Sequence, residues 1–112
     1  MDLNADDLRR DDAWVVGADG EMAGFYRLSR ADDRFEIEEF HLDPPMIGRG
    51  IGWLMFSHAV QRARQAGAQW LVWSTDANSL GFYLHVGGEV TGTEPSGIEG
   101  DEPLTRMRLA LD

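Results

Sequence analysis

Three glycines alternate along a short stretch that could bind an anion. Gly48, Gly50 and Gly52 follow a run with the pattern of a β-strand and precede a run with the pattern of an amphipathic helix. Glycine accepts positive φ and allows a ligand close to the backbone, and the first N–H groups of a helix lack partners inside it. These amides and the positive end of the helix dipole suit a phosphate. Because a tight corner needs only one glycine, the three favour an anion site over a simple turn.

The spacing of these glycines excludes two common phosphate loops. A dinucleotide fingerprint requires G-x-G-x-x-G, but Trp53 stands where the third glycine counted from Gly48 would lie, and Met55 where it would lie counted from Gly50. A P-loop ends in Gly-Lys-Ser/Thr, which the sequence lacks. The G-x-G-x-G turn instead resembles that of the GCN5-related N-acetyltransferase (GNAT) family. In that family the turn follows a strand and a proline and holds the pyrophosphate of acetyl-CoA.

A second motif strengthens this resemblance. Asn78, the pair Phe82-Tyr83 and Gly87 reproduce the shape of a family segment that follows the strand after the main helix, and a PSGIEG loop precedes the last apolar run, as in bacterial members. The likeness covers residues 13–111 and implies a GNAT-like fold with acetyl-CoA as cosubstrate. The cofactor contacts that it implies are Phe40, His41, Leu42, Ile47, Gly48, Arg49, Gly50, Ile51, Gly52, Trp53, Asn78 and Phe82.

The resemblance gives particular roles to Tyr83 and Asn78. It implies that Tyr83 is the general acid that protonates the leaving thiolate, and that Asn78 contacts the pantetheine arm. From the residues alone, Tyr83 could instead pack one face of a short helix, and Asn78 could cap the N-terminus of that helix. Ile47 departs from the family, which often has Arg or Gln before the first glycine, and this implies a weakened contact there. The backbone of residues 40–42 is expected to run beside the pantetheine, which pairs with it like an additional strand.

Acidic side chains on the strand before the glycine turn are candidates for a general base. An alkylamine with a pKa of about 10.4 is almost entirely protonated at neutral pH, so a carboxylate that takes its proton assists the attack. Strand alternation puts Glu36 and Glu38 on one face and Glu39 on the other. The resemblance places the base on this strand, so Glu38 and Glu39 are both candidates, and a solvated strand face is the alternative for each. His41 shares the face of Glu39 and could be base or core. The three histidines show no ligand clustering, so no metal site is predicted.

Apolar periodicity and turn residues define the elements that must position these side chains. The segment from 35 to 75 reads as a strand, a helix and a strand, which form a βαβ unit, and three short strands up to residue 42 form an antiparallel meander. The sequence therefore predicts an α/β fold with a mixed sheet. The predicted elements are strands at 13–17, 21–29 and 35–42, a helix at 50–65, a strand at 69–75, a helix at 76–86, and strands at 89–92 and 104–111.

Two further expectations concern the first helix and the N-terminal segment. The helix at 50–65 has a face of Ile51, Leu54 and Met55, which Trp53, Phe56 and Val60 widen into a broad apolar arc. Residues 1–12 are polar and acidic and could form one or two helical turns with Asn4 as the cap.

Length and composition indicate one domain, residues 1–112, with a single modest core. Without cysteine there is no disulfide framework and no thiol nucleophile. The sequence has no apolar run near the length of a membrane span and no signal-peptide pattern, so we expect a cytoplasmic protein. The net charge of -10 opposes nonspecific binding to nucleic acid or anionic membranes. It would favour a cationic acceptor such as an amine, although acidic surfaces commonly serve solubility.

The resemblance implies an N-acetyltransferase that moves an acetyl group from acetyl-CoA to a small-molecule or protein amine by direct attack. The alternative is a noncatalytic acetyl-CoA-binding or protein-interaction module. It arises because full members begin with a strand and one or two helices that help wall the acceptor site, whereas only residues 1–12 precede the first clear strand here. Without those elements Trp14 and Val16, or Val15, would lie near an open sheet edge. We therefore expect a homodimer in which the partner supplies part of the acceptor wall.

Overall fold

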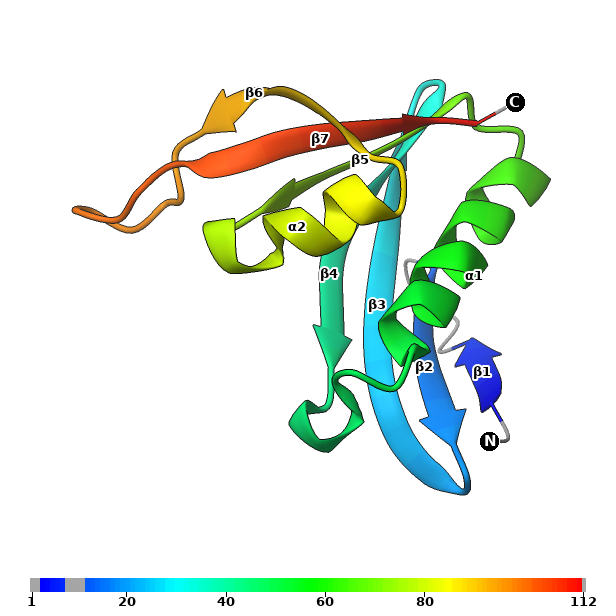
Figure 1. The fold of residues 1–112 in the computed structure, drawn as a ribbon. Coiled ribbons are helices and arrows are strands. Elements are labelled where there is room, and N and C mark those ends of the chain that lie inside the picture. Colours follow the sequence, from blue (N-terminus) through cyan, green and yellow to red (C-terminus); the bar gives the residue numbers. More distant parts are fainter. Residues whose placement is uncertain (1–2, 8–11, 112) are drawn as a thin grey trace.

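The computed structural model describes residues 3–7 and 12–111, which form a mixed β-sheet and two α-helices (Figure 1). In chain order the elements are β1 (Leu3–Asp7), β2 (Ala13–Ala18), β3 (Glu21–Ala31), β4 (Arg34–Leu42), the 3-10 helix η1 (Pro44–Met46), α1 (Ile51–Gln65), β5 (Trp70–Thr75), α2 (Ala77–His85), β6 (Glu89–Glu94) and β7 (Leu104–Ala110).

The strands of the described residues form one sheet in the order β1-β2-β3-β4-β5-β7-β6. The strands from β1 to β4 pair antiparallel, β4 and β5 pair parallel, and β7 pairs antiparallel with both β5 and β6. The parallel pair is joined through α1, as a crossover requires. The predicted α/β fold, with a meander followed by a βαβ unit, is therefore confirmed.

The N-terminal segment differs from its prediction. Leu3–Asp7 is a strand, not a helical turn, and Asn4 pairs with Gly17 instead of capping a helix. Asn and Asp are poor helix formers, and pairing satisfies the backbone groups that β2 would otherwise leave open. Because β1 covers β2 from Ala18 to Trp14, β2 is not an edge strand, and the expectation of an open sheet edge at Trp14 and Val16 is wrong.

Both helices lie on one side of the sheet (Figure 1), and Phe40 of β4 contacts both of them. The Phe40 ring lies 6.5 Å from that of Phe56 on α1 and 6.3 Å from that of Phe82 on α2. The buried stripe of α1 is Ile51, Met55, Phe56, Ala59, Val60 and Ala63.

The apolar arc of α1 is narrower than predicted. Trp53 and Leu54 are exposed by 54% and 38%, because positions 51, 55, 59 and 63 recur on one side of a helix with 3.6 residues per turn. Close packing of α1 depends on Gly24 in β3. A Cβ there would lie 2.6 Å from both the His41 carbonyl oxygen and Met55 Sδ, so a side chain would push α1 away from the sheet.

The parallel strands β4 and β5 are paired only at their beginnings. The register joins Arg34 with Trp70, Phe35 with Leu71 and Glu36 with Val72, and it ends there. β4 continues to Leu42 beside β3, while β5 continues beside β7, and Figure 1 shows the two strands diverging. The split leaves room between the second halves of β4 and β5, next to the start of α2.

Among the described residues, neither helix is long and apolar enough to cross a membrane.

Candidate functional site

The glycine turn adopts the backbone conformation that its sequence requires. Gly48 and Gly50 have φ of +85° and +78°, values that residues with a side chain rarely adopt. Gly50 is the N-cap of α1 and offers no side-chain hydrogen bond, and the first turn of α1 holds no acidic residue. A Cβ built at Gly48 or Gly50 would meet no described atom within 4 Å. No side chain caps the amides at the start of α1, and the space beside them is open. An anion could therefore approach these amides.

A cavity of about 660 Å³ adjoins this turn. Its walls come from the end of β4, the glycine turn and α2, a size and position typical of a small-molecule site. Of the predicted residues it brings together Phe40, Leu42, Ile47, Gly48, Gly50, Gly52, Trp53, Asn78, Phe82 and Tyr83, and it adds Ser79 and His85.

Three residues predicted to contact the cofactor lie outside this lining. Ile51 is fully buried in the core, so only its backbone is available to a ligand. His41 is exposed, and its ring stacks on that of Phe25 at 6.3 Å. Arg49 is held by Asp19, whose Oδ2 lies 3.6 Å from its Nη2, and by Met46 Sδ.

Tyr83 is enclosed by aromatic rings and only 7% exposed. The ring centroids of Phe40, Phe56, Trp73 and Phe82 lie 6.1, 6.0, 5.3 and 5.1 Å from its own. Burial and, second, the charge of Asp76 raise the pKa of Tyr83 to about 12. The phenol therefore stays protonated throughout the physiological range and can donate a hydrogen bond.

A second cavity, of about 170 Å³, lies in the split between β4 and β5. Phe40, Ser79 and Tyr83 line both cavities, so the two adjoin at Tyr83. The remaining lining residues of the second cavity are Ile37, Glu38, Glu39, Trp73, Ser74, Thr75 and Asp76.

The two candidate bases reach this cavity from one face of the sheet. The β3–β4 register skips Glu38 between Glu39 and Ile37, which is the signature of a β-bulge. Arg27 Nε donates to Glu39 Oε2 at 3.2 Å, and Ser29 Oγ donates to Glu38 Oε1 at 2.6 Å. Because Arg27 and Ser29 alternate on one face of β3, Glu38 and Glu39 share that face. The prediction that they lie on opposite faces is wrong, and the bulge is the reason.

The start of α2 also differs in detail from its prediction. Asp76 is the N-cap, with its Oδ1 accepting the Ser79 N–H at 2.9 Å. Asn78 lies inside the helix and lines the larger cavity, so the alternative role of Asn78 as the cap is wrong. An Asp directly before a helical run is a capping signal, and reading it would have identified Asp76 as the cap beforehand.

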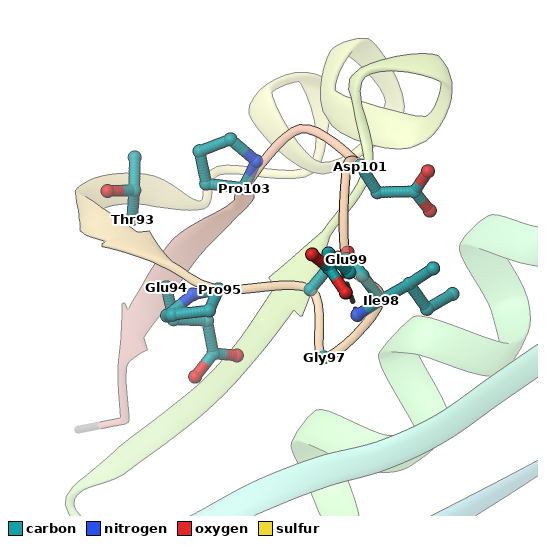
Figure 2. Close-up of a pocket in the computed structure, with 9 residues that line it drawn as sticks. Thr93, Glu94, Pro95, Gly97, Ile98, Glu99, Asp101 and Pro103 are labelled. Atoms are coloured by element: carbon teal, nitrogen blue, oxygen red, sulfur yellow. Dashed lines mark hydrogen bonds between the residues drawn. The ribbon is translucent and has the colours of Figure 1, made fainter.

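A third hollow, of about 500 Å³, belongs to the loop between β6 and β7 (Figure 2). The residues drawn there all come from positions 93–103, and the Ile98 N–H donates to Ser96 Oγ at 3.1 Å. Neither the glycine turn nor Tyr83 contributes to it. Within residues 3–7 and 12–111, no group of three or more His, Asp or Glu side chains is arranged to hold a metal ion.

Comparisons with known proteins identify relatives of this chain. The family model described as "Acetyltransferase (GNAT) family" matches residues 2–87. Streptothricin acetyltransferase from Streptomyces lavendulae is 34% identical over 91 residues, which are 77% of this chain and 48% of that protein. The chain thus spans about half the length of this curated relative.

Solved structures with low sequence identity share the fold. A Bacillus subtilis acetyltransferase in complex with CoA superposes with a TM-score of 0.83 at 20% identity, over 94% of this chain and 80% of that one. A nourseothricin acetyltransferase superposes with a TM-score of 0.81 at 24% identity, over 92% and 67%. The predicted GNAT-like acyltransferase fold is confirmed. The family match across most of the sequence and the shared fold establish that this chain belongs to the acetyltransferase (GNAT) family.

Proposed function

We propose that this chain transfers an acetyl group from acetyl-CoA to the amine of a small molecule or a protein. The observation that carries the proposal is the position of Tyr83, which lines both the cavity at the glycine turn and the cavity at Glu38 and Glu39. A donor in the first cavity and an acceptor in the second would meet at its hydroxyl. Family membership and the streptothricin acetyltransferase relative support acetyl transfer to an amine.

The larger cavity fits acetyl-CoA in three respects. Its glycine turn offers amides without a side-chain cap for the pyrophosphate, at Gly48 to Trp53. Beyond Glu36, β4 has no pairing with β5 among the described residues. The backbone at Phe40, His41 and Leu42 can therefore pair with an extended pantetheine arm as with an added strand. Asn78 and Phe82 of α2 also line this cavity, and Ile47 offers its backbone in place of a polar side chain.

The reaction joins the amine nitrogen to the acetyl carbon and breaks the bond from that carbon to sulfur. The acceptor loses one proton and the departing sulfur gains one, so the products are an amide and a thiol. A phenol with a pKa of about 12 is a weaker acid than a thiol, for which the pKa is about 8.5. We therefore assign Tyr83 to donating a hydrogen bond to the sulfur as negative charge develops there, in place of the full proton transfer that the resemblance implies. The proton that completes the thiol is the one that the acceptor amine loses.

Glu38 is the better of the two candidates for the base. Glu39 is ion-paired with the Arg27 guanidinium, whereas Glu38 accepts from the neutral hydroxyl of Ser29. Among the described residues Glu38 has no ion-pair partner, so its charge is available to attract an ammonium and take its proton. Asp76 adds a third carboxylate to the same cavity, which favours a cationic amine over a neutral or anionic acceptor.

We also propose that residues 1–112 form one domain, act in the cytoplasm where acetyl-CoA is available, and associate as a homodimer. One sheet joins the described strands, which supports a single domain. For the dimer, β6, one of the two edge strands of the described sheet, takes the place of β2 as the candidate contact. Val90 on β6 is 53% exposed, and unpaired edges invite another chain. Sedimentation over a concentration series tests it, and a monomer at every concentration would contradict it.

The experiment on function is a thermal-shift titration with acetyl-CoA and CoA, followed by thiol release against a panel of amines. Ligand at a hundredfold excess over Kd should stabilise the fold by about 2.7 kcal/mol. The amine panel includes streptothricin, a lysine peptide and a simple alkylamine, with an alcohol of the same shape as the alkylamine as the control. Stabilisation together with amine-dependent thiol release supports the enzyme. Stabilisation without release would instead favour the noncatalytic binding module.

A further inference from the structure

α2 forms one wall of the larger cavity although it is a short helix. It is nine residues long, fewer than an isolated helix needs to be stable in water. Its position must therefore depend on its anchors. Tyr83, packed among aromatic rings, is one anchor, and the first turn is the other. The α2 residues that line the larger cavity are Asn78, Ser79, Phe82, Tyr83 and His85.

Asp76 fixes that first turn from two directions. Its backbone is extended, with φ of -79° and ψ of 173°, and its Oδ1 accepts the Ser79 N–H at 2.9 Å. Its carbonyl oxygen accepts from Thr75 Oγ1 at 3.0 Å, and Thr75 is buried at the end of β5. Asp76 thus links a rigid strand to the helix that walls the cavity.

The carboxylate of Asp76 also belongs to the surroundings of Tyr83. Both residues line the smaller cavity, and the charge of Asp76 adds to burial in raising the pKa of Tyr83. The other titratable side chains that line a cavity together with Tyr83 are Glu38 and Glu39 on β4 and His85 at the end of α2.

We propose that Asp76 is a positioning residue with two separable actions: its capping hydrogen bond holds the α2 wall of the cofactor cavity, and its charge acts on the Tyr83 hydroxyl. The consequences for CoA affinity and for turnover rest on the proposed function, whereas the titration of Tyr83 does not. CoA affinity and the titration of Tyr83 can be measured without any acceptor.

Two substitutions separate the two actions. Asp76→Asn keeps the cap, because Asn caps helices as well as Asp does, but removes the charge. Asp76→Glu keeps the charge but loses the cap, because the longer side chain is not suited to the N-cap bond. Asp32→Asn is the matched control. Asp32 is exposed in the turn between β3 and β4, at a φ of +56° that Asn tolerates, and it lines neither cavity.

The charge is tested by titrating tyrosinate absorbance. The sequence has two tyrosines, so the absorbance titration has two contributions. The contribution that is missing from the curve of Tyr83→Phe belongs to Tyr83. We expect this contribution at lower pH in Asp76→Asn and unchanged in Asp76→Glu and Asp32→Asn. In a pH profile of turnover, the alkaline fall should likewise move to lower pH in Asp76→Asn alone. If Tyr83 titrates at the same pH in Asp76→Asn as in the native protein, the proposed action of the charge is wrong.

The cap is tested by CoA affinity. We expect the Kd of Asp76→Asn and Asp32→Asn to stay within about twofold of native, and that of Asp76→Glu to rise about fivefold, the factor that corresponds to a typical lost cap. Native affinity in Asp76→Glu would overturn the positioning role.

If Asp76→Glu does not fold, amide hydrogen exchange replaces it. The Ser79 N–H should be protected in the native protein and in Asp76→Asn, and unprotected exchange in the native protein would overturn the cap. Native protein that binds no CoA would refute the proposed function, while the tyrosinate titration would still decide the action of the charge.

Discussion

Tyr83 is a buried residue that lines both cavities of the candidate site. Tyr83→Phe removes the hydroxyl and preserves the packing against Phe40, Phe56 and Trp73. We expect kcat to fall by roughly ten- to a thousandfold, as for a lost hydrogen-bond donor to a developing negative charge, with the Kd for acetyl-CoA nearly unchanged. Steady-state thiol release and calorimetry measure the two quantities. Unchanged kcat would leave Tyr83 as a core residue only.

The same substitution has a consequence for alkaline stability. Tyr83 has a pKa of about 12 in the folded chain and about 10 when unfolded. Between these values the unfolded state has lost a proton that the folded state keeps, so the free energy of unfolding falls as pH rises. This pKa difference of about two corresponds to about 3 kcal/mol in the free energy of unfolding. The contribution is fully present below about pH 10 and lost by about pH 12.

Urea denaturation at about pH 9 and about pH 12 checks this effect. We expect Tyr83→Phe to lose less stability than the native chain over that interval. The comparison is favourable because all ten basic side chains besides histidine are arginines, which stay charged in this range. Equal losses in the two proteins would show that Tyr83 titrates normally.

Glu38 and Glu39 differ in their partners and should differ in their importance. Glu38→Gln should lower kcat by roughly a hundredfold or more, as expected for a lost general base, and the loss should shrink as rising pH deprotonates the amine in solution. Glu39→Gln is the matched control on the same strand, and its effect should be smaller because Glu39 is already paired with Arg27. A larger loss in Glu39→Gln would reverse the assignment.

Among the elements, the turn from Gly48 to Gly52 is decisive for binding. Gly50→Val forces a β-branched residue to a φ of +78°, and its side chain would occupy the space through which the pyrophosphate approaches. Gly67→Val is the control, because Gly67 has a φ of +79° at the other end of α1 and lines neither cavity. Both variants should lose about 1–3 kcal/mol of stability through backbone strain. Only Gly50→Val should lose acetyl-CoA binding, as measured by calorimetry, and equal binding by the two variants would contradict the anion site.

The elements differ in how well local sequence patterns predict them. Gly48, Gly50 and the Phe82-Tyr83 pair were found because their signal is local: glycine spacing and helix periodicity act over a few residues. The strand Leu3–Asp7 was missed because its stability comes from pairing with β2, whose register no local pattern contains. The shared face of Glu38 and Glu39 was missed for a similar reason, since a bulge is fixed by two strands together.

At the scale of the whole molecule, the site depends on the split sheet. β4 leaves β5 after Glu36, and α2 closes one side of the opening. The cavities on either side of Tyr83 therefore come from segments far apart in the sequence. Sequence reasoning could name most lining residues from a resemblance, but it could not show that they form two adjoining cavities.

The central claim is that an acceptor amine meets the acetyl donor at Tyr83, and the most direct measurement is the stoichiometry of the products. The sequence contains no lysine, so the protein's own side chains offer no competing amine. The purified chain is incubated with acetyl-CoA and each amine, and mass spectrometry counts the acetylated acceptor against the CoA thiol released. We predict one acetylated amine per thiol, with both formed roughly ten- to a thousandfold more slowly in Tyr83→Phe. Thiol release without an acetylated amine, or equal amounts of product in Tyr83→Phe, would contradict the account.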